Sequence, residues 1–204
     1  MAEVKLRISS IQSVTANQMP LVPPLIREFC YLQLRMVCEL IALGCLIAHG
    51  DIKETTSLRG EWSADTIVKR MAELKADFFP DPVDITESTE PGKYKWLISG
   101  PVIRKGERAT NYLTSKDLLR LYGKCGDALH RGSLRKVLSG KVPVQLQFSD
   151  IDGHVSKLLE LLRYHAIFLS NGKIMVLCQY DRLGQPGALI MAEKRGDLPP
   201  DLAL

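Results

Sequence analysis

The stretch that decides the fold is residues 25–49, LIREFCYLQLRMVCELIALGCLIAH, which is apolar over about seven helical turns. Its most apolar part, residues 36–48, contains one charged residue, Glu39. These 13 residues fall short of the ~20 that a membrane-spanning helix needs. Pro23–Pro24 suit the first turn of a helix, and Gly50 suits the position after its end. The pattern therefore predicts one long helix buried in a protein core.

Three further helices are predicted around this one, each from apolar residues at helical spacing. They cover residues 63–77, 114–130 and 150–170. The second of them opens with Thr114 and Asp117 at the spacing of a capping box, in which each residue binds the other's backbone N–H group. With the long helix, these segments predict a four-helix core.

Short strands are predicted where apolar and polar residues alternate. Such patterns occur at residues 3–10, where a frayed helix is the alternative, and at residues 94–98 and 142–148. Two β-rich runs, 173–180 and 188–193, flank a loop containing glycine and proline and so predict a hairpin. The predicted fold class is α+β, a four-helix core with a small, mostly antiparallel sheet that includes a C-terminal hairpin.

The remaining segments are predicted as connections. Residues 77–90 carry five carboxylates and no lysine or arginine, which is typical of an exposed loop. Residues 100–110 are polar and are also predicted as a connector. We expect residues 1–195 to form a single α+β domain, and residues 196–204, with their two prolines, to form a loose C-terminal tail.

Composition indicates an ordinary water-soluble protein, because 46% of the residues are hydrophobic and 25% are charged. The five cysteines include no CxxC pair, and residues 1–10 contain no continuous apolar run. An odd number of cysteines without a leader favours a reducing, cytoplasmic location. His154 and His165 lie eleven residues apart on one predicted helix, too far apart for one metal ion. We therefore expect no metal, no cofactor and no membrane association.

The strongest functional signal is the segment 116–141, which carries seven basic and two acidic residues. Its net charge of +5 exceeds the +4 of the whole chain. A local concentration of positive charge attracts phosphate groups. The residues predicted to contact nucleic acid are Arg120, Lys124, Arg131, Arg135, Lys136 and Lys141.

Two glycines accompany a histidine on this segment. At about 100° per residue, Gly123, Gly126 and His130 lie along one stripe of the predicted helix. Glycines allow another backbone to approach closely, so the stripe predicts an interface with a helix of the same chain, with a second copy or with a ligand. Lys124 lies ~120° around the helix from His130 and about 9 Å along it. The two side chains could grip one phosphate across a two-fold axis but not within one chain.

The spacing of Lys124 and His130 resembles the motif of the HEPN superfamily, an arginine followed after four to six residues by a histidine. Many members are metal-independent endoribonucleases that act as dimers in toxin–antitoxin and phage-defence systems. The resemblance implies that His130 transfers protons and that Lys124, at the arginine position, stabilises charge on the phosphate. The segment 122–130, YGKCGDALH, is also similar to a Y-G-x-C-G-x-x-L-H pattern in uncharacterised bacterial proteins, which implies no function.

Three functions are compatible with these residues. The first is a HEPN-like module of a bacterial defence or toxin–antitoxin system that binds RNA or another phosphate ligand through residues 116–141. The second is a non-enzymatic protein-interaction subunit, and the third is a dimeric, metal-independent endoribonuclease. Lys124 lacks the bidentate fork with which an arginine suits phosphate, so the motif is degenerate and the enzyme is the less favoured function. The expected partners are RNA or a nucleotide, another protein, or a second copy of the chain.

Overall fold

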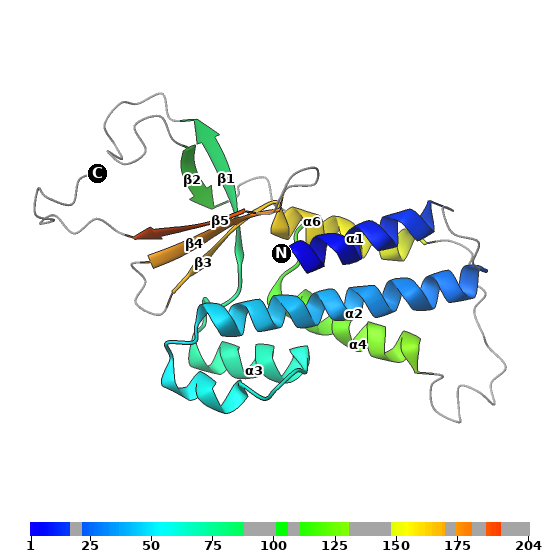
Figure 1. Cartoon of the computed structure of the whole chain (residues 1–204), viewed down its shortest axis with the longest axis horizontal. Coiled ribbons are helices and arrows are strands. Elements are labelled where there is room, and N and C mark those ends of the chain that lie inside the picture. Colours follow the sequence, from blue (N-terminus) through cyan, green and yellow to red (C-terminus); the bar gives the residue numbers. More distant parts are fainter. Residues whose placement is uncertain are drawn as a thin grey trace, which may run out of the picture.

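Helices occupy most of the described chain, and a small sheet lies to one side of them (Figure 1). The computed structural model describes residues 1–16, 22–87, 101–105, 111–130, 148–169, 174–180 and 187–192. Its α-helices are α1 (Ala2–Thr15), α2 (Pro23–Ala48), α3 (Ala64–Leu74), α4 (Ser115–Leu129) and α6 (Ser149–Leu162). The predicted α+β class, with a helical core, a small antiparallel sheet and a C-terminal hairpin, is confirmed.

Helix α2 is the central element and contacts α1, α3, α4 and α6. It begins with Pro23 and Pro24 in its first turn, where their missing N–H groups leave no intrahelical bond unmade. Leu34 and Cys38 on its inner side are fully buried. By length and composition α2 could cross a membrane, and half of its most apolar window is buried inside the protein. The prediction of a long buried helix is confirmed.

Residues 3–10 belong to helix α1, so the predicted strand is wrong and the alternative of a helix is right. The buried residues Val4, Ile8 and Ile11 follow helical spacing and face α2. Leu6 completed the apparent alternation, but it points to solvent with 65% of its surface exposed. The exposed Leu6 therefore produced a strand-like alternation of apolar and polar residues in a segment that is an amphipathic helix.

Helix α3 begins close to the predicted position. The side-chain hydrogen bonds at its start are made by Glu61 and not by the N-cap residue, Ser63. The Ser63 side chain makes no cap hydrogen bond. Instead, the Glu61 carboxylate accepts hydrogen bonds from the backbone N–H groups of Trp62 and Ser63 at 2.9 and 2.8 Å. The preceding predicted loop contains a short 3-10 helix, η1 (Lys53–Leu58).

The capping box at the start of α4 is confirmed. The Asp117 backbone N–H donates to the Thr114 hydroxyl at 3.1 Å, and the Thr114 N–H donates to the Asp117 carboxylate at 3.3 Å. The hydrogen bonds from Thr114 hold the pKa of Asp117 below its usual range. The first turn of α4 is thereby fixed, and with it the direction of every side chain that follows.

The sheet is antiparallel throughout and has the strand order β2-β1-β3-β4-β5. Its strands are β1 (Asp81–Glu87), β2 (Pro101–Lys105), β3 (Tyr164–Phe168), β4 (Ile174–Gln179) and β5 (Gly187–Ala192). The β4–β5 hairpin is the predicted one. The centre of the sheet joins distant parts of the chain, because Asp81 pairs with Ala166 and Pro82 with His165.

Three sequence predictions about this region are wrong. Strand β1 lies within the predicted acidic loop 77–90, and β2 lies within the predicted connector 100–110. The predicted helix 150–170 ends at Leu162, and His165 stands on strand β3 rather than on that helix. Burial of Ala166 and Ile167 against the neighbouring strands outweighs their helical spacing with the residues before them.

Other predictions fall outside the described residues. These are the strand at 94–98, the domain limit at 195, the tail at 196–204 and all but the last residue of the strand at 142–148, whose Phe148 is the N-cap of α6.

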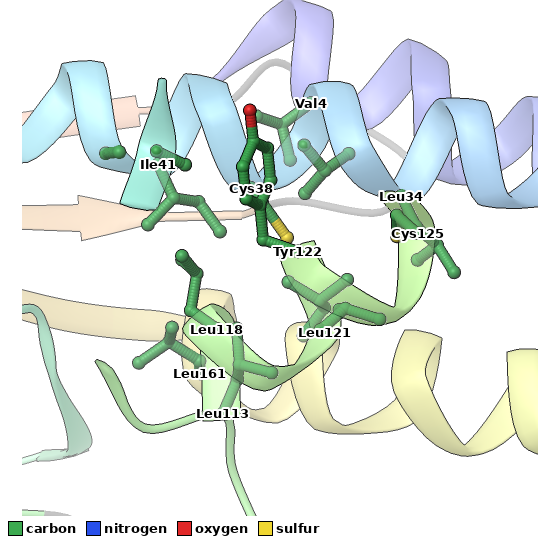
Figure 2. Packing of buried hydrophobic residues seen from close by; sticks show 14 of the residues in the cluster. Val4, Leu34, Cys38, Ile41, Leu113, Leu118, Leu121, Tyr122, Cys125 and Leu161 are labelled. Atoms are coloured by element: carbon green, nitrogen blue, oxygen red, sulfur yellow. The ribbon is translucent and has the colours of Figure 1, made fainter. Parts of the chain in front are cut away.

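The core surrounds α2, where apolar side chains of α1, α3, α4 and α6 meet those of α2. Figure 2 shows part of it, with residues of α1, α2, α4 and α6. All five cysteines are buried and unpaired. Burial raises the pKa of Cys30 to about 11, and that of Cys45 and of Cys125 to about 12. These thiols stay neutral near pH 7 and act as small hydrophobic side chains, as predicted for the three on α2.

Candidate functional site

Helix α4 has one buried face and one exposed face. Leu118, Leu121 and Cys125 point into the core (Figure 2). On the opposite face, at about 100° per residue, stand exposed residues that include most of the predicted contacts in this helix. We define this α4 face as Lys116, Arg120, Gly123, Lys124, Asp127 and His130.

Arg120 is a highly accessible cation of the α4 face. Its side chain is 77% exposed and lies 3.3 Å from the Asp117 carboxylate. An exposed ion pair of this kind contributes little, because water screens it and the long side chain loses freedom. Asp117 is already engaged by the capping box, so the guanidinium of Arg120 can turn to an incoming anion.

The glycines differ in what surrounds them. A Cβ atom added at Gly123 would meet nothing within 4 Å, and one added at Gly126 would lie 3.7 Å from the Arg35 side chain. Among the described residues, no other helix therefore packs closely against Gly123. The interfaces with a second copy or a ligand stay predictions for this position.

Replacing Gly123 by alanine is expected to stabilise the isolated protein by about 0.5–1 kcal/mol, because alanine restricts the unfolded chain and meets open space here. Urea denaturation measures this change. Gly50→Ala is the control, since its Cβ would lie 3.3 Å from the Ile47 carbonyl oxygen and should give no gain. A loss of stability in Gly123→Ala would show that its backbone has a partner within the chain.

His130 is exposed at the C-terminal end of α4. Its backbone N–H donates to the Gly126 carbonyl at 3.0 Å, and its backbone is extended. The predicted contact residues Arg131, Arg135, Lys136 and Lys141 lie outside the described part of the chain. Of the predicted site residues, the structure thus places Arg120, Lys124, His130 and the two glycines.

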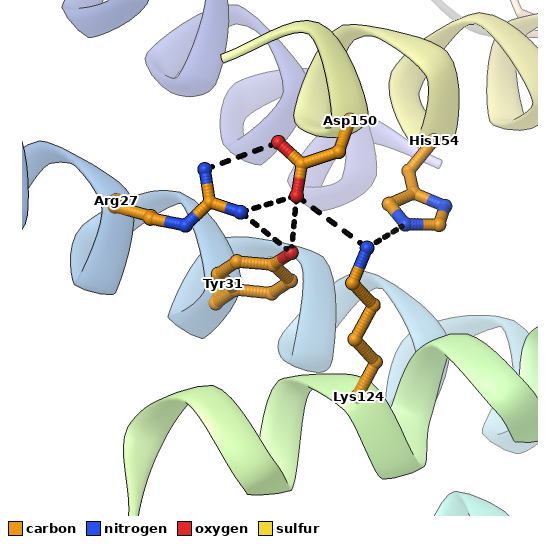
Figure 3. A network of polar contacts seen from close by, with 5 residues as sticks. All are labelled: Arg27, Tyr31, Lys124, Asp150 and His154. Atoms are coloured by element: carbon orange, nitrogen blue, oxygen red, sulfur yellow. Dashed lines mark hydrogen bonds and ion pairs between the residues drawn. The ribbon is translucent and has the colours of Figure 1, made fainter. Parts of the chain in front are cut away.

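Lys124 belongs to a polar cluster that joins α2, α4 and α6 (Figure 3). We define this three-helix cluster as Arg27, Tyr31, Lys124, Asp150 and His154. Asp150 is its centre and accepts hydrogen bonds from both terminal nitrogens of Arg27, one of them at 3.1 Å. The Tyr31 hydroxyl donates to the same carboxylate at 2.7 Å, and Lys124 Nζ lies 3.4 Å from it.

The two cations and the hydroxyl fix the ionisation of Asp150. Partial burial opposes its negative charge, but hydrogen bonds from Arg27 and Tyr31 outweigh burial and hold the pKa of Asp150 well below its usual range. Burial and the hydrogen bond to Asp150 raise the pKa of Tyr31 above its ordinary value, so Tyr31 remains a donor. Arg27 and Lys124 also lie over the Tyr31 ring, 5.3 and 5.8 Å from its centroid.

His154 extends the cluster along α6. Its Nε2 lies 3.3 Å from Lys124 Nζ. Burial, followed by the charge of Lys124, lowers the pKa of His154, so the neutral imidazole is favoured and accepts a hydrogen bond from the ammonium group. With His154 neutral, two cations face one carboxylate, and the cluster carries one excess positive charge beside the α4 face.

Within one chain Lys124 contacts Asp150 and His154, and its predicted meeting with His130 across a two-fold axis stays a prediction. Sequence reasoning missed these partners because they stand 26 and 30 residues beyond Lys124. The proximity of Arg27 and Tyr31 could have been predicted from the sequence, since residues four apart lie on one side of a helix.

A second polar group explains part of the YGKCGDALH segment. The Tyr122 hydroxyl donates to Glu39 at 3.1 Å and accepts from Arg35 at 2.9 Å, and Arg35 stacks 4.6 Å from the ring centroid. Cys125 is fully buried, and a Cβ added at Gly126 would make only an ordinary contact with the Arg35 side chain, at 3.7 Å. The tyrosine and the cysteine of this segment therefore hold α4 against α2.

Among the described residues, no group of three or more His, Cys, Asp or Glu side chains is arranged to hold a metal ion. None of the protein-family models, curated proteins or solved structures compared with the chain matches it. The resemblance to the HEPN superfamily therefore stays a prediction, and any function has to be argued from the geometry.

Proposed function

We propose that this protein is a HEPN-like module of a bacterial defence or toxin–antitoxin system that binds RNA or another phosphate-bearing ligand through the α4 face. The observation that carries the proposal is the row of Lys116, Arg120, Lys124 and His130, all exposed on one side of one helix. Along the axis the row extends ~21 Å from Lys116 to His130, long enough to meet several phosphates of one strand.

The chemistry of the face suits phosphate. The exposed guanidinium of Arg120 can donate two parallel hydrogen bonds to phosphate oxygens. Gly123 lies between Arg120 and His130 and leaves the helix surface bare, so a sugar–phosphate backbone can come close. Asp127 is the one carboxylate of the α4 face.

The three-helix cluster borders this surface. The Lys124 side chain is 45% exposed, and its partner Asp150 is 27% exposed. A phosphate approaching Lys124 would compete with Asp150, while Arg27 holds that carboxylate in place. Lys124 can therefore turn to the ligand without leaving Asp150 unpaired.

Reversing the charge of the α4 face should weaken RNA binding. In Lys116→Glu/Arg120→Glu we expect the affinity for labelled single-stranded RNA to fall at least ~10-fold, with a shallower dependence on salt because fewer counterions are released. Fluorescence anisotropy at several salt concentrations measures both. Lys69→Glu/Arg70→Glu on α3 makes the same charge change at exposed positions and should have a small effect. Equal losses in the two variants would mean that net charge, and not the α4 face, governs binding.

The same samples test the endoribonuclease alternative. It requires His130 of one copy to meet Lys124 of another, since within one chain Lys124 contacts Asp150 and His154. Cleavage that is lost in His130→Ala would establish an enzyme. A wild-type protein that neither binds nor cleaves RNA would move the assignment to a protein-interaction subunit.

A further inference from the structure

Helix α2 carries an apolar stripe on the side opposite Leu34 and Cys38, and three of its members, Phe29, Leu40 and Leu43, also pack against the edge of the core. We define this α2 stripe by residues at helical spacing on that side: Leu25, Phe29, Leu32, Met36, Leu40, Leu43 and Ile47. Leu25, Leu32 and Ile47 are 49%, 44% and 80% exposed, and the other four are half-buried. Leu34 and Cys38, on the opposite side, are fully buried. No other described helix shows a comparable row of exposed large apolar side chains.

The spacing keeps the α2 stripe straight. Its members follow one another at intervals of 4, 3, 4, 4, 3 and 4 residues, which is two repeats of 11. Eleven residues in three turns give ~3.67 per turn, close to the 3.6 of an undistorted helix. The stripe therefore stays on one side of α2 over ~33 Å, and none of its members is charged.

The spacing of the stripe is symmetric about Met36, because the intervals are 4, 3 and 4 residues in either direction along the helix. If a second α2 lies antiparallel against the first, with a two-fold axis at Met36, Leu25 opposes Ile47 of the second copy. By the same symmetry Phe29 opposes Leu43, Leu32 opposes Leu40, and Met36 opposes its own counterpart. A two-fold interface requires a surface that is complementary to itself in this way. We infer that two copies of this chain associate through the α2 stripe, antiparallel and centred on Met36.

The size of the stripe agrees with this assignment. From the exposed fractions, its side chains leave on the order of 500 Å² of apolar surface on each chain. A standard interface buries ~800 Å² per partner, of which about two-thirds is apolar in homodimers. Gly44 beside the stripe has nothing within 4 Å of an added Cβ, so it leaves room for the second helix.

The residues that flank the stripe argue against a lipid surface as its occupant. Helices that lie on membranes carry lysine or arginine beside their apolar face. On α2 the flanking positions hold Glu28, Gln33 and Glu39. The cations next to them are engaged within the chain, since Arg35 is bonded to Glu39 at 3.2 Å and Arg7 of α1 donates to Gln33 at 2.9 Å. A carboxylate-bordered apolar stripe suits a second copy better than anionic headgroups.

Cysteine cross-linking tests the arrangement directly, because all five native cysteines are buried. Under mild oxidation, Met36→Cys is expected to form a disulfide-linked dimer in high yield. Leu25→Cys alone and Ile47→Cys alone should not cross-link, but a mixture of the two should. Cross-linking of Leu25→Cys to itself would show a parallel pair, and no cross-link at Met36 would overturn the proposal.

Analytical ultracentrifugation provides the second test, with no RNA present. Wild-type protein is expected to be a dimer at micromolar concentration, and Leu32→Glu should weaken dimerisation at least tenfold while its circular dichroism is unchanged. Leu6→Glu changes an even more exposed leucine, on α1, and should remain dimeric. A monomeric wild type, or a dimer insensitive to Leu32→Glu, would overturn the proposal. So would a monomer that binds vesicles of anionic phospholipid through Leu32.

Discussion

Replacing Asp150 by alanine is expected to lower the free energy of unfolding by about 2–3 kcal/mol. The change leaves Arg27 and Lys124 facing each other without their shared carboxylate, and it removes the acceptor of the Tyr31 hydroxyl. Loss of one member of a fully buried ion pair costs ~3–5 kcal/mol. Asp150 is 27% exposed, so water recovers part of that cost.

Urea denaturation of wild type and variant measures this loss. Asp152→Ala is the matched control, because Asp152 stands in the same first turn of α6 and is exposed. Both carboxylates interact favourably with the positive end of the helix, an effect of ~0.3–1 kcal/mol that the comparison removes. Equal losses in the two variants would mean that the three-helix cluster adds no stability beyond this common effect.

Acidification from pH 7 to pH 4 is expected to remove about 3 kcal/mol of stability through His165. This side chain is 3% exposed, and its Nδ1 lies 3.2 Å from the Leu162 carbonyl oxygen. Burial lowers the pKa of His165 to about 4, against ~6.5 in an unfolded chain. Between these values the unfolded chain binds a proton that the folded protein does not. Stability therefore falls with decreasing pH at up to ~1.4 kcal/mol per unit.

The measurement is the free energy of unfolding at several pH values between 7 and 4. In His165→Gln, which can still donate to Leu162, the dependence on pH should become clearly flatter. Ile167→Val in the same strand costs about 1 kcal/mol without removing a titrating group, so it should keep the wild-type slope. If His165→Gln keeps that slope as well, other groups, such as His154 with its lowered pKa, carry the acid sensitivity.

The sequence predicts those parts of the fold that depend on local periodicity. The long apolar stretch gives α2, and the capping box of Thr114 and Asp117 gives the start of α4. Where burial depends on a distant partner, local patterns mislead. Leu6 imitates a strand in α1, and the residues after Leu162 continue a helical pattern although strand pairing decides their conformation.

The candidate site likewise has features that the local sequence predicts and features that depend on tertiary packing. The accessible cations of α4 follow from the chain alone, because a buried apolar face determines which residues face outward. The partners of Lys124 do not follow from it, since Asp150 and His154 reach it only after α6 has packed against the other helices. The glycine at position 123 is visible in the sequence, but what surrounds it is a property of the packed molecule.

The pairing of β1 with β3 has a consequence for synthesis of the chain. Asp81 and Pro82 must wait for His165 and Ala166, which are made about 80 residues later, or roughly 4–16 s later at 5–20 residues per second. During that time one edge of β1 has no partner strand, and an open edge invites pairing with other nascent chains. Proline and carboxylates are the residues that discourage such pairing, and β1 carries Pro82 with three of the carboxylates that had suggested a loop. The acidic composition of β1 is therefore of the kind that discourages aggregation of a growing chain before its sheet is complete.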